Sequence, residues 1–300
     1  MNFDISPWSE ERFVELNKRI LASKLHHGLL LSGKAGIGKT QFAVALAKSL
    51  LCDSLEANST CGKCQGCLLL QAGSHPDFHP VESEKQIGVD AIRQVTAQLQ
   101  KTPQIGKNKV CIIYQAESLT EAAANALLKT LEEPTPNTYI ILVTDAQHKL
   151  LPTILSRCEK QGLSPPTKQQ TIDWLAINLP NVNVPGIILD LFAESPYRLN
   201  NLLTDEKFPD ASQFESMLKQ IKHQAISGLS MVKLWENHAD ILLSMCALKT
   251  GEIYQSSLSE QDYAYYQLCV NAQEKINQTG INKALLLHSV VENTALAYKE

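Results

Sequence analysis

One short motif constrains this chain more than any other part of its sequence. Residues 33–40 read Gly-Lys-Ala-Gly-Ile-Gly-Lys-Thr, which fits the phosphate-binding pattern G-x-x-x-x-G-K-[ST]. An apolar run at 27–32 precedes the motif, and a stretch with helical spacing at 39–51 follows it. A strand, a glycine-rich loop and a helix N-terminus in this order surround an anion with backbone N–H groups. The context therefore favours a nucleotide site over the alternative, a glycine-rich turn without a ligand.

The residues of this loop have separate tasks. Gly33, Gly36 and Gly38 belong to the turn whose N–H groups surround the phosphates. Lys39 is expected to reach the β- and γ-phosphates, and the Thr40 hydroxyl is expected to bind Mg²⁺. We therefore predict that the chain can bind ATP or ADP with Mg²⁺.

The strand that should complete a nucleotide hydrolase lacks its acids. Residues 109–117 read Lys-Val-Cys-Ile-Ile-Tyr-Gln-Ala-Glu. Gln115 and Ala116 stand where a hydrolase needs one carboxylate for Mg²⁺ and a second to orient water. Glu117 lies further along and would need an unusual strand end to substitute. Because loss of a positioned base costs about 10²–10⁴ in rate, we expect very slow turnover.

Four of the eight cysteines are clustered. Cys52, Cys61, Cys64 and Cys67 follow the pattern C-x8-C-x2-C-x2-C, and the other four are scattered. In a reducing cytosol such a cluster indicates metal ligands rather than disulfides. Four thiolates close a tetrahedral Zn²⁺ site and leave no open position, so the predicted zinc is structural. Tight turns at 62–63 and 65–66 suit this site, and free thiols on a flexible insertion are the alternative.

Composition excludes several classes of protein. The chain has 300 residues, of which 44% are hydrophobic, and this suits a globular protein of two or three domains. Its net charge of −4 argues against a freestanding nucleic-acid binder, which usually carries a basic excess. No apolar run reaches transmembrane length, and the first residues lack the regions of a signal peptide. We therefore expect a cytoplasmic protein with no membrane contact.

The first half of the chain alternates strands and helices. Strand-like runs at 27–32, 77–81, 110–114 and 139–143 are separated by helical spacing at 39–51, 89–99 and 120–133. Ser118 or Thr120 caps the last of these helices, and Pro134 ends it. The alternation predicts an α/β fold with a doubly wound parallel sheet.

The chain changes character after Leu163. The sequence Ser-Pro-Pro-Thr at 164–167 marks a boundary, and short helices are expected up to about residue 203. Beyond it we predict helices near 211–227, 231–249, 259–278 and 281–298, with turns at 250–251 and 279–280. This all-α third carries no catalytic cluster, and its helices serve either packing alone or oligomerisation.

Two stretches resemble a known protein family. Residues 119–134 read Leu-Thr-Glu-Ala-Ala-Ala-Asn-Ala-Leu-Leu-Lys-Thr-Leu-Glu-Glu-Pro, and residues 151–158 read Leu-Pro-Thr-Ile-Leu-Ser-Arg-Cys. Both resemble bacterial DNA polymerase III clamp-loader subunits of the AAA+ class, and the cysteine insertion is similar to that family's zinc module. The acid-free strand and the segments 73–77 and 88–91 favour the delta-prime branch over the hydrolysing tau/gamma branch. The resemblance spans about residues 20–165.

The resemblance implies a protein in three parts. These are an AAA+ nucleotide-binding domain at 1–163 that carries the zinc module at 52–67, a small helical lid at 164–206, and a helical oligomerisation collar at 207–300. The collar would join tau/gamma and delta subunits in a pentameric ring, which acts on the sliding clamp and on primer-template DNA.

The resemblance also assigns individual residues. Arg157, in Ser-Arg-Cys, matches the arginine finger that enters a neighbouring subunit's ATP site; an ordinary surface arginine is the alternative. Thr144 matches the sensor-1 position near the γ-phosphate, and sensor 2 falls on Arg198 or Tyr197. The chain is then a stator that helps to load the clamp without hydrolysing ATP itself. An active tau/gamma-like ATPase and a zinc-dependent DNA-binding module are the competing functions.

Overall fold

The computed structural model describes residues 5–56, 59–276, 278 and 280–298. The chain forms two compact units. The first runs to Thr171 and also takes in Glu194–Tyr197, and the second contains Ile172–Ala193 and continues from Arg198. Each unit has its own hydrophobic core.

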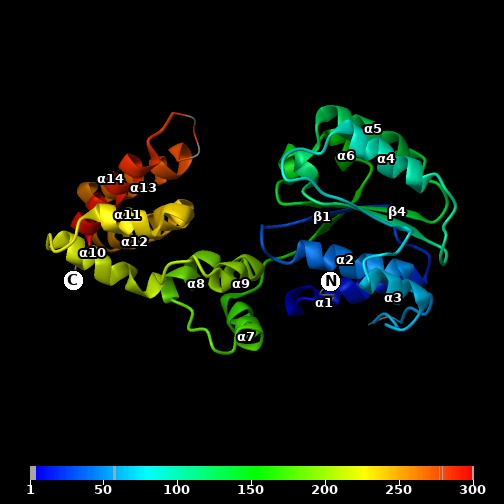
Figure 1. Ribbon diagram of the computed structural model, residues 1–300, viewed down its shortest axis with the longest axis horizontal. Helices are drawn as coiled ribbons and strands as arrows, with labels where there is room; N and C mark the ends of the chain where they lie inside the picture. The colour runs from blue at the N-terminus through cyan, green and yellow to red at the C-terminus, as the bar shows by residue number, and fades with distance from the viewer. Residues whose placement is uncertain (1–4, 57–58, 277, 279, 299–300) are drawn as a thin grey trace. The chain divides into compact units, whose positions relative to one another are not determined.

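A parallel sheet forms the centre of the first unit (Figure 1). Its strands are β1 (Gly28–Ser32), β2 (Phe78–Val81), β3 (Lys109–Ile113), β4 (Thr138–Thr144) and β5 (Glu159–Gly162), in the spatial order β2-β3-β4-β1-β5. Every neighbouring pair among them is parallel. Apolar runs in β1, β3 and β4 are buried because helices cover both faces of the sheet. The predicted α/β class with a parallel sheet is confirmed.

Helices cover the two faces in two layers (Figure 1). One layer contains α1 (Glu10–Leu21), α2 (Lys39–Leu51) and α3 (Gln65–Gln71), and the other contains α4 (Val89–Leu99), α5 (Glu121–Glu132) and α6 (Pro152–Leu155). Side chains alternate between the layers along each strand: Leu29 and Leu31 pack with the first, and Leu30 packs with the second. Thr120 is the cap of α5, because its Oγ1 accepts a hydrogen bond from the N–H of Ala123.

The last strand of the sheet was not predicted from the sequence. β5 reads Glu-Lys-Gln-Gly and has no apolar side chain, so it lacks the hydrophobic run by which the other strands were found. It lies at the edge of the sheet and pairs only with β1. Leu29 is opposite Glu159, and Ser32 is opposite Gly162. An edge strand needs less apolar surface than a central one, so a polar sequence is tolerated there.

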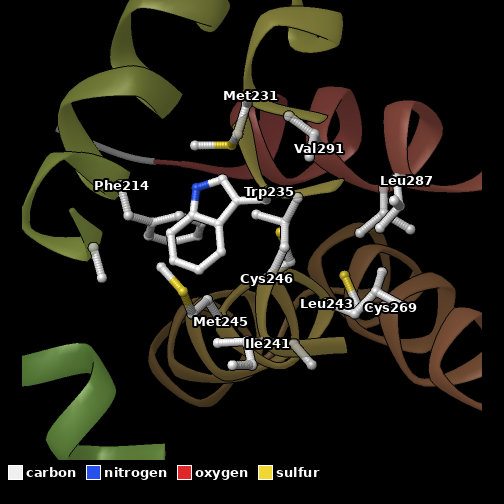
Figure 2. Packing of buried hydrophobic residues seen from close by; sticks show 14 of the residues in the cluster. Phe214, Met231, Trp235, Ile241, Leu243, Met245, Cys246, Cys269, Leu287 and Val291 are labelled. Carbon is white, nitrogen blue, oxygen red and sulfur yellow. The ribbon is translucent and has the colours of Figure 1, made fainter. Parts of the chain in front are cut away.

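The second unit is helical. Its helices are α8 (Gly186–Phe192), α9 (Pro196–Thr204), α10 (Phe214–Lys222), α11 (Gly228–Leu234), α12 (Ala239–Ser257), α13 (Glu260–Lys275) and α14 (Lys283–Ala297), and α7 (Lys168–Asn178) leads into it. Short 3₁₀ turns occur in both units. Those at Pro7–Ser9, Ala116–Ser118 and Gln147–Lys149 belong to the first unit, and those at Ala211–Gln213 and Glu236–His238 belong to the second. The indole of Trp235 is buried among side chains of α10, α11 and α12, including Phe214, Met231 and Met245 (Figure 2). No helix in the described part of the chain is long and apolar enough to cross a membrane.

Two helix boundaries in this unit differ from the sequence-based expectation. The predicted helix at 231–249 is two helices, because α11 ends at Leu234 and α12 begins at Ala239. The predicted turn at 250–251 is wrong, since α12 continues through both residues to Ser257. The Thr250 hydroxyl donates to the carbonyl of Cys246 within the helix. At Gly251 an added Cβ would lie 3.4 Å from the ring of Tyr266, an ordinary van der Waals contact, so this glycine is an interior residue of α12 that faces α13.

Candidate functional site

The glycine-rich loop connects β1 to α2, at the carboxyl edge of the sheet. Gly36 and Gly38 have φ angles of 77° and 98°, a region that side-chain-bearing residues rarely adopt. Gly38 is the N-cap of α2, so the free N–H groups of the first helical turn face the loop. Thr40 is exposed in this turn. The backbone therefore has the form of an anion cradle.

Lys39 is enclosed by acceptors of the chain itself. Its side chain is 4% exposed, and its Nζ donates to the carbonyls of Gly33 at 2.8 Å and Lys34 at 2.6 Å. Asp145 supplies the third acceptor, because its Oδ1 lies 2.5 Å from the same Nζ. An ammonium group has three N–H donors, so this set accounts for all of them. Asp145 was not singled out in the sequence, although it directly follows Thr144.

The outer side of the loop is held by residues distant in the sequence. Ser195 Oγ donates to the carbonyl of Ala35 at 2.7 Å, the N–H of Tyr197 donates to Gly36 at 3.0 Å, and Trp8 Nε1 donates to Ile37 at 2.9 Å. Three successive carbonyls thus have donors from outside the loop. These contacts hold the backbone of residues 35–37 in place.

Tyr197 also closes one side of the cradle. A Cβ added at Gly38 would lie 2.6 Å from Tyr197 Cε2 and 2.9 Å from Ser6 Oγ. The Tyr197 hydroxyl is 3.0 Å from the same Ser6 oxygen. Arg198, the other sensor-2 candidate, pairs with Asp240 in the second unit at 3.1 Å. Of the two candidates, Tyr197 is the one with a contact on the loop, and the chain order alone did not distinguish them.

Thr144 lies beside the start of the loop. It is opposite Ser32 in the β1–β4 register, is 1% exposed, and its Oγ1 accepts from the N–H of Ala146. β3 ends next to this point. Gln115 has a φ of 48°, which turns the chain into a 3₁₀ turn that carries Glu117. Glu117 Oε1 accepts from the N–H of Asp145 at 3.3 Å, so the strand end has the unusual form that would bring Glu117 toward the loop.

Arg157 lies at the opposite end of the strands, the amino end. It lies two residues before Glu159, the first residue of β5, which is opposite Leu29 in β1, whereas the loop follows the last residue of β1. A five-residue strand is about 16 Å long, so the Arg157 backbone is separated from the loop by about that length. The guanidinium contacts Glu132 and donates to the carbonyl of Thr153 at 2.9 Å. The sequence-predicted residues Lys39 and Thr144 are thus brought together, and Arg157 is not among them.

The four clustered cysteines converge on one point. Their sulfur atoms all lie within 4.8 Å of one another; Cys52 Sγ is 3.6 Å from Cys61 Sγ and 4.0 Å from Cys64 Sγ. A disulfide bond is about 2.05 Å long, so these are not disulfides. A tetrahedral ion with Zn–S bonds of about 2.3 Å separates its sulfurs by about 3.8 Å. The cluster therefore has the dimensions of a four-thiolate metal site.

Local structure explains this convergence. Cys52 caps the end of α2 and Cys64 caps the start of α3, and Gly62 has a φ of 68° in the turn between Cys61 and Cys64. The predicted second turn at 65–66 is instead the first turn of α3. Gly66 is required there, because an added Cβ would lie 2.2 Å from the carbonyl oxygen of Leu51.

Electrostatics in the cluster favour a thiolate at one ligand. The backbone N–H groups of Lys63 and Cys64 lower the pKa of the Cys61 thiol to about 6. Burial raises the pKa of the Cys52 and Cys67 thiols. A bound cation stabilises thiolates that are otherwise protonated, so the set can hold a metal ion. Among the described residues it is the one group of three or more metal-ligating side chains of this kind.

Residues 8–167 match the family described as DNA polymerase III, delta subunit, and this match covers more than half of the chain. The chain belongs to the DNA polymerase III delta-prime subunit family. It is 42% identical over 173 residues to DNA polymerase III subunit delta-prime of Escherichia coli strain K12, covering 57% of this chain and 52% of that protein. With the Pseudomonas aeruginosa delta-prime subunit the identity is 36% over 239 residues, covering 78% and 72%.

Two further comparisons concern a tau/gamma subunit and a solved structure. DNA polymerase III subunit tau/gamma of Haemophilus influenzae is 35% identical over 271 residues, covering 88% of this chain and 38% of that protein. A Thermotoga maritima DNA polymerase III, gamma subunit-related protein has a TM-score of 0.55 at 20% identity, and the match covers 95% of this chain and 99% of that one. The last similarity shows a shared fold. The chain spans about half the length of the E. coli delta-prime protein.

Proposed function

We propose that this chain is a clamp-loader stator of the delta-prime type, an AAA+ subunit that helps to load the sliding clamp on DNA without hydrolysing ATP itself. One observation carries the proposal. A formed phosphate loop lies beside the end of β3, where Gln115 and Ala116 stand in place of acids. Arg157 lies at the opposite, amino end of the strands. The site can hold a nucleotide but lacks part of the hydrolytic machinery, and a catalytic arginine faces elsewhere.

The loop side of the proposal concerns binding. Gly33, Gly36, Gly38, Lys39, Thr40 and Thr144 would hold ATP or ADP with Mg²⁺. A bound nucleotide would supply phosphates to the loop N–H groups and a metal ion to the Thr40 hydroxyl. Gln115 offers a neutral amide, and Ala116 is fully buried and has no polar side chain. Neither can orient water as a carboxylate does, so bound nucleotide would persist.

The arginine side of the proposal concerns a neighbouring subunit. Arg157 is 32% exposed as a side chain, and its partner Glu132 is 47% exposed, so their ion pair can open without unpacking the core. When released, the guanidinium would stabilise charge on the phosphoryl group in the adjacent site. We assign this finger role in trans, because the chain's own loop lies at the other end of the strands.

The remaining parts would support assembly. We propose Zn²⁺ as the ion of the cysteine cluster, in a structural role. We also keep the division into an AAA+ domain at 1–163, a lid at 164–206 and a collar at 207–300. The collar would join tau/gamma and delta subunits in a pentameric ring, and contacts with the clamp and primer-template DNA would follow through the complex. Such a subunit acts in the cytoplasm.

One observation favours a second candidate, an active tau/gamma-like ATPase. Glu117, one residue beyond the missing acids, is turned toward the end of β4, where it contacts the N–H of Asp145. One of its carboxylate oxygens, Oε2, is buried without a hydrogen-bond partner. A carboxylate is therefore present near the loop, at a shifted position in the chain.

Two assays separate the candidates. The isolated chain should show no ATP turnover above the background of its Lys39→Ala variant. Appreciable turnover that Lys39→Ala and Glu117→Gln both abolish would overturn the stator assignment. In a loader rebuilt from all its subunits, Arg157→Ala should lower turnover at the partner's site by about 10³-fold or more. Arg93→Ala, a change at another exposed arginine, is the control; an unaltered ATPase rate with Arg157→Ala would remove the finger role.

A further inference from the structure

The ion pair between Lys39 and Asp145 lies inside the phosphate loop. Lys39 is almost fully buried, whereas the Asp145 side chain is 47% exposed. Lys39 Nζ and Asp145 Oδ1 are 2.5 Å apart, and Nζ also donates hydrogen bonds to two backbone carbonyls of the loop. Asp145 therefore provides the only anionic group that the described residues place within ion-pair distance of this ammonium.

A buried ammonium needs such a partner. Removing an ammonium from water is costly unless a negative charge and hydrogen-bond acceptors replace the solvent. In the nucleotide-binding function proposed above, a phosphate oxygen would provide that charge, because Lys39 would reach the β- and γ-phosphates. The Asp145 carboxylate and a phosphate oxygen thus have the same chemistry toward Lys39, and both are anionic oxygen acceptors.

We propose that Asp145 is an internal competitor of nucleotide, whose carboxylate stands in for a phosphate oxygen on Lys39 and must leave before a nucleoside di- or triphosphate binds. This inference rests on the proposed nucleotide-holding role of the loop. Asp145 would then set how tightly the loop holds its ligand.

The surroundings of Asp145 allow this exchange. Its backbone is anchored, because the N–H of Asp145 donates to Glu117 and the next N–H donates to Thr144 Oγ1. The side chain is half exposed, so it can rotate into water while the strand end stays in place. After rotation its charge would remain near the phosphates, together with that of Glu117. Two carboxylates beside the loop repel a polyphosphate, so the competition opposes binding both by occupying Lys39 and by repulsion.

The ion pair would also stabilise the loop itself. A buried lysine without an anion would destabilise the loop, whereas the ion pair with Asp145 satisfies it. The pair would thus favour a formed loop and at the same time lower the affinity of the loop for nucleotide. A stator can use such a loop as a fixed structural element.

The test compares Asp145→Asn with the wild-type chain. Binding of ADP and ATP is measured by calorimetry on the full chain, once with Mg²⁺ and once with EDTA. Asp90→Asn is the matched control, because it removes one carboxylate from an exposed helix position in the same unit. Lys39→Ala tests whether the measured binding occurs at the loop. We expect Asp145→Asn to tighten binding of both nucleotides about tenfold or more, with and without Mg²⁺, and Asp90→Asn to leave it unchanged.

Each other outcome has a defined meaning. Equal affinity of wild type and Asp145→Asn, with loss in Lys39→Ala, would overturn the competition and leave the nucleotide site intact. If Asp145→Asn binds nucleotide more weakly than wild type with Mg²⁺ but not with EDTA, Asp145 would be a metal ligand. This result would also overturn the competition. No binding by any variant would overturn both the competition and the nucleotide-holding role. If Asp145→Asn unfolds in buffer, inorganic pyrophosphate should restore its fold, and failure to do so would count against the inference.

Discussion

Lys39 and Arg157 lie at opposite ends of the strands of one parallel sheet. Lys39 follows the carboxyl end of β1, whereas Arg157 precedes β5, which starts level with the beginning of β1. The two positive groups therefore cannot act on the same phosphate within one chain. In the ring proposed above, the amino ends of these strands could meet the carboxyl ends of the strands in a neighbour, and this geometry is the basis for the proposed role of Arg157 in trans.

The contact between Arg157 and Glu132 leads to the first prediction. Both side chains are partly exposed, so Glu132→Gln should change the free energy of unfolding by about 1 kcal/mol or less. The variant frees the guanidinium and leaves Arg157, the proposed finger, intact. A loader containing Glu132→Gln should therefore keep its DNA-stimulated ATPase, unlike one containing Arg157→Ala. Equal losses in the two variants would indicate that the pair serves the local structure, and not a neighbouring site.

A second prediction concerns the metal. The purified chain should contain one Zn²⁺, measured by atomic absorption, and Cys64→Ser should remove it, because Cys64 both caps α3 and closes the four-sulfur set. The thermal midpoint of the variant should fall, since the module loses its central bonds. Cys111→Ala is the control: Cys111 is buried in β3, away from the cluster, so this variant should retain its metal even if it is less stable. Folded wild-type protein without metal would refute the site.

Gly38 gives a third prediction. Its φ of 98° and the nearby ring of Tyr197 both oppose a side chain, so Gly38→Ala should destabilise the first unit by about 1–3 kcal/mol. Gly88→Ala is a matched control, because Gly88 is also a helix N-cap but has an ordinary φ of −79° and no atom near its missing Cβ. Gly88→Ala should lower the free energy of unfolding by no more than about 1 kcal/mol. Chemical denaturation of the two variants measures the difference, and similar costs would show that Tyr197 does not restrict the loop.

The sequence predicted the features of the fold that depend on local patterns. The apolar runs of β1, β3 and β4 and the glycine-rich loop each have a local signal, so the parallel sheet could be expected. β5 has no such signal, because an edge strand is held by its pairing with β1 and can be polar. The predicted turn at 250–251 was wrong for a related reason: Gly251 lies inside α12, and its type alone does not distinguish a glycine within a helix from one that ends a helix.

The site was predictable to a similar extent. The motif located Lys39, and the cysteine spacing located the four sulfurs that the structure brings together. The partner of Lys39 was missed, because Asp145 is more than a hundred residues away in sequence and belongs to no motif. Ser195, which is 160 residues from Ala35, was missed as a loop contact for the same reason, and Trp8 was missed because it also belongs to no motif. Contacts that depend on which strand ends are adjacent in space require the sheet order, which the pattern of strands does not provide.

The last prediction concerns pH and the buried side chain of His75. Burial lowers the pKa of His75 and outweighs the opposing effects of Asp77 and Asp53, and the Nδ1 of the ring accepts from the N–H of Asp77. Because the unfolded chain then binds a proton more readily than the folded one, stability is complete above the ordinary pKa of about 6.5 and falls as pH decreases below it. His75→Asn keeps an acceptor for Asp77 and removes the titrating group. The variant should therefore lose less unfolding free energy than wild type between pH 7.5 and pH 5.5, as measured by urea denaturation in buffer containing Zn²⁺. His148→Asn, at an exposed position, should lose as much as wild type. If His75→Asn and wild type lose the same amount, the ring of His75 does not account for the acid sensitivity.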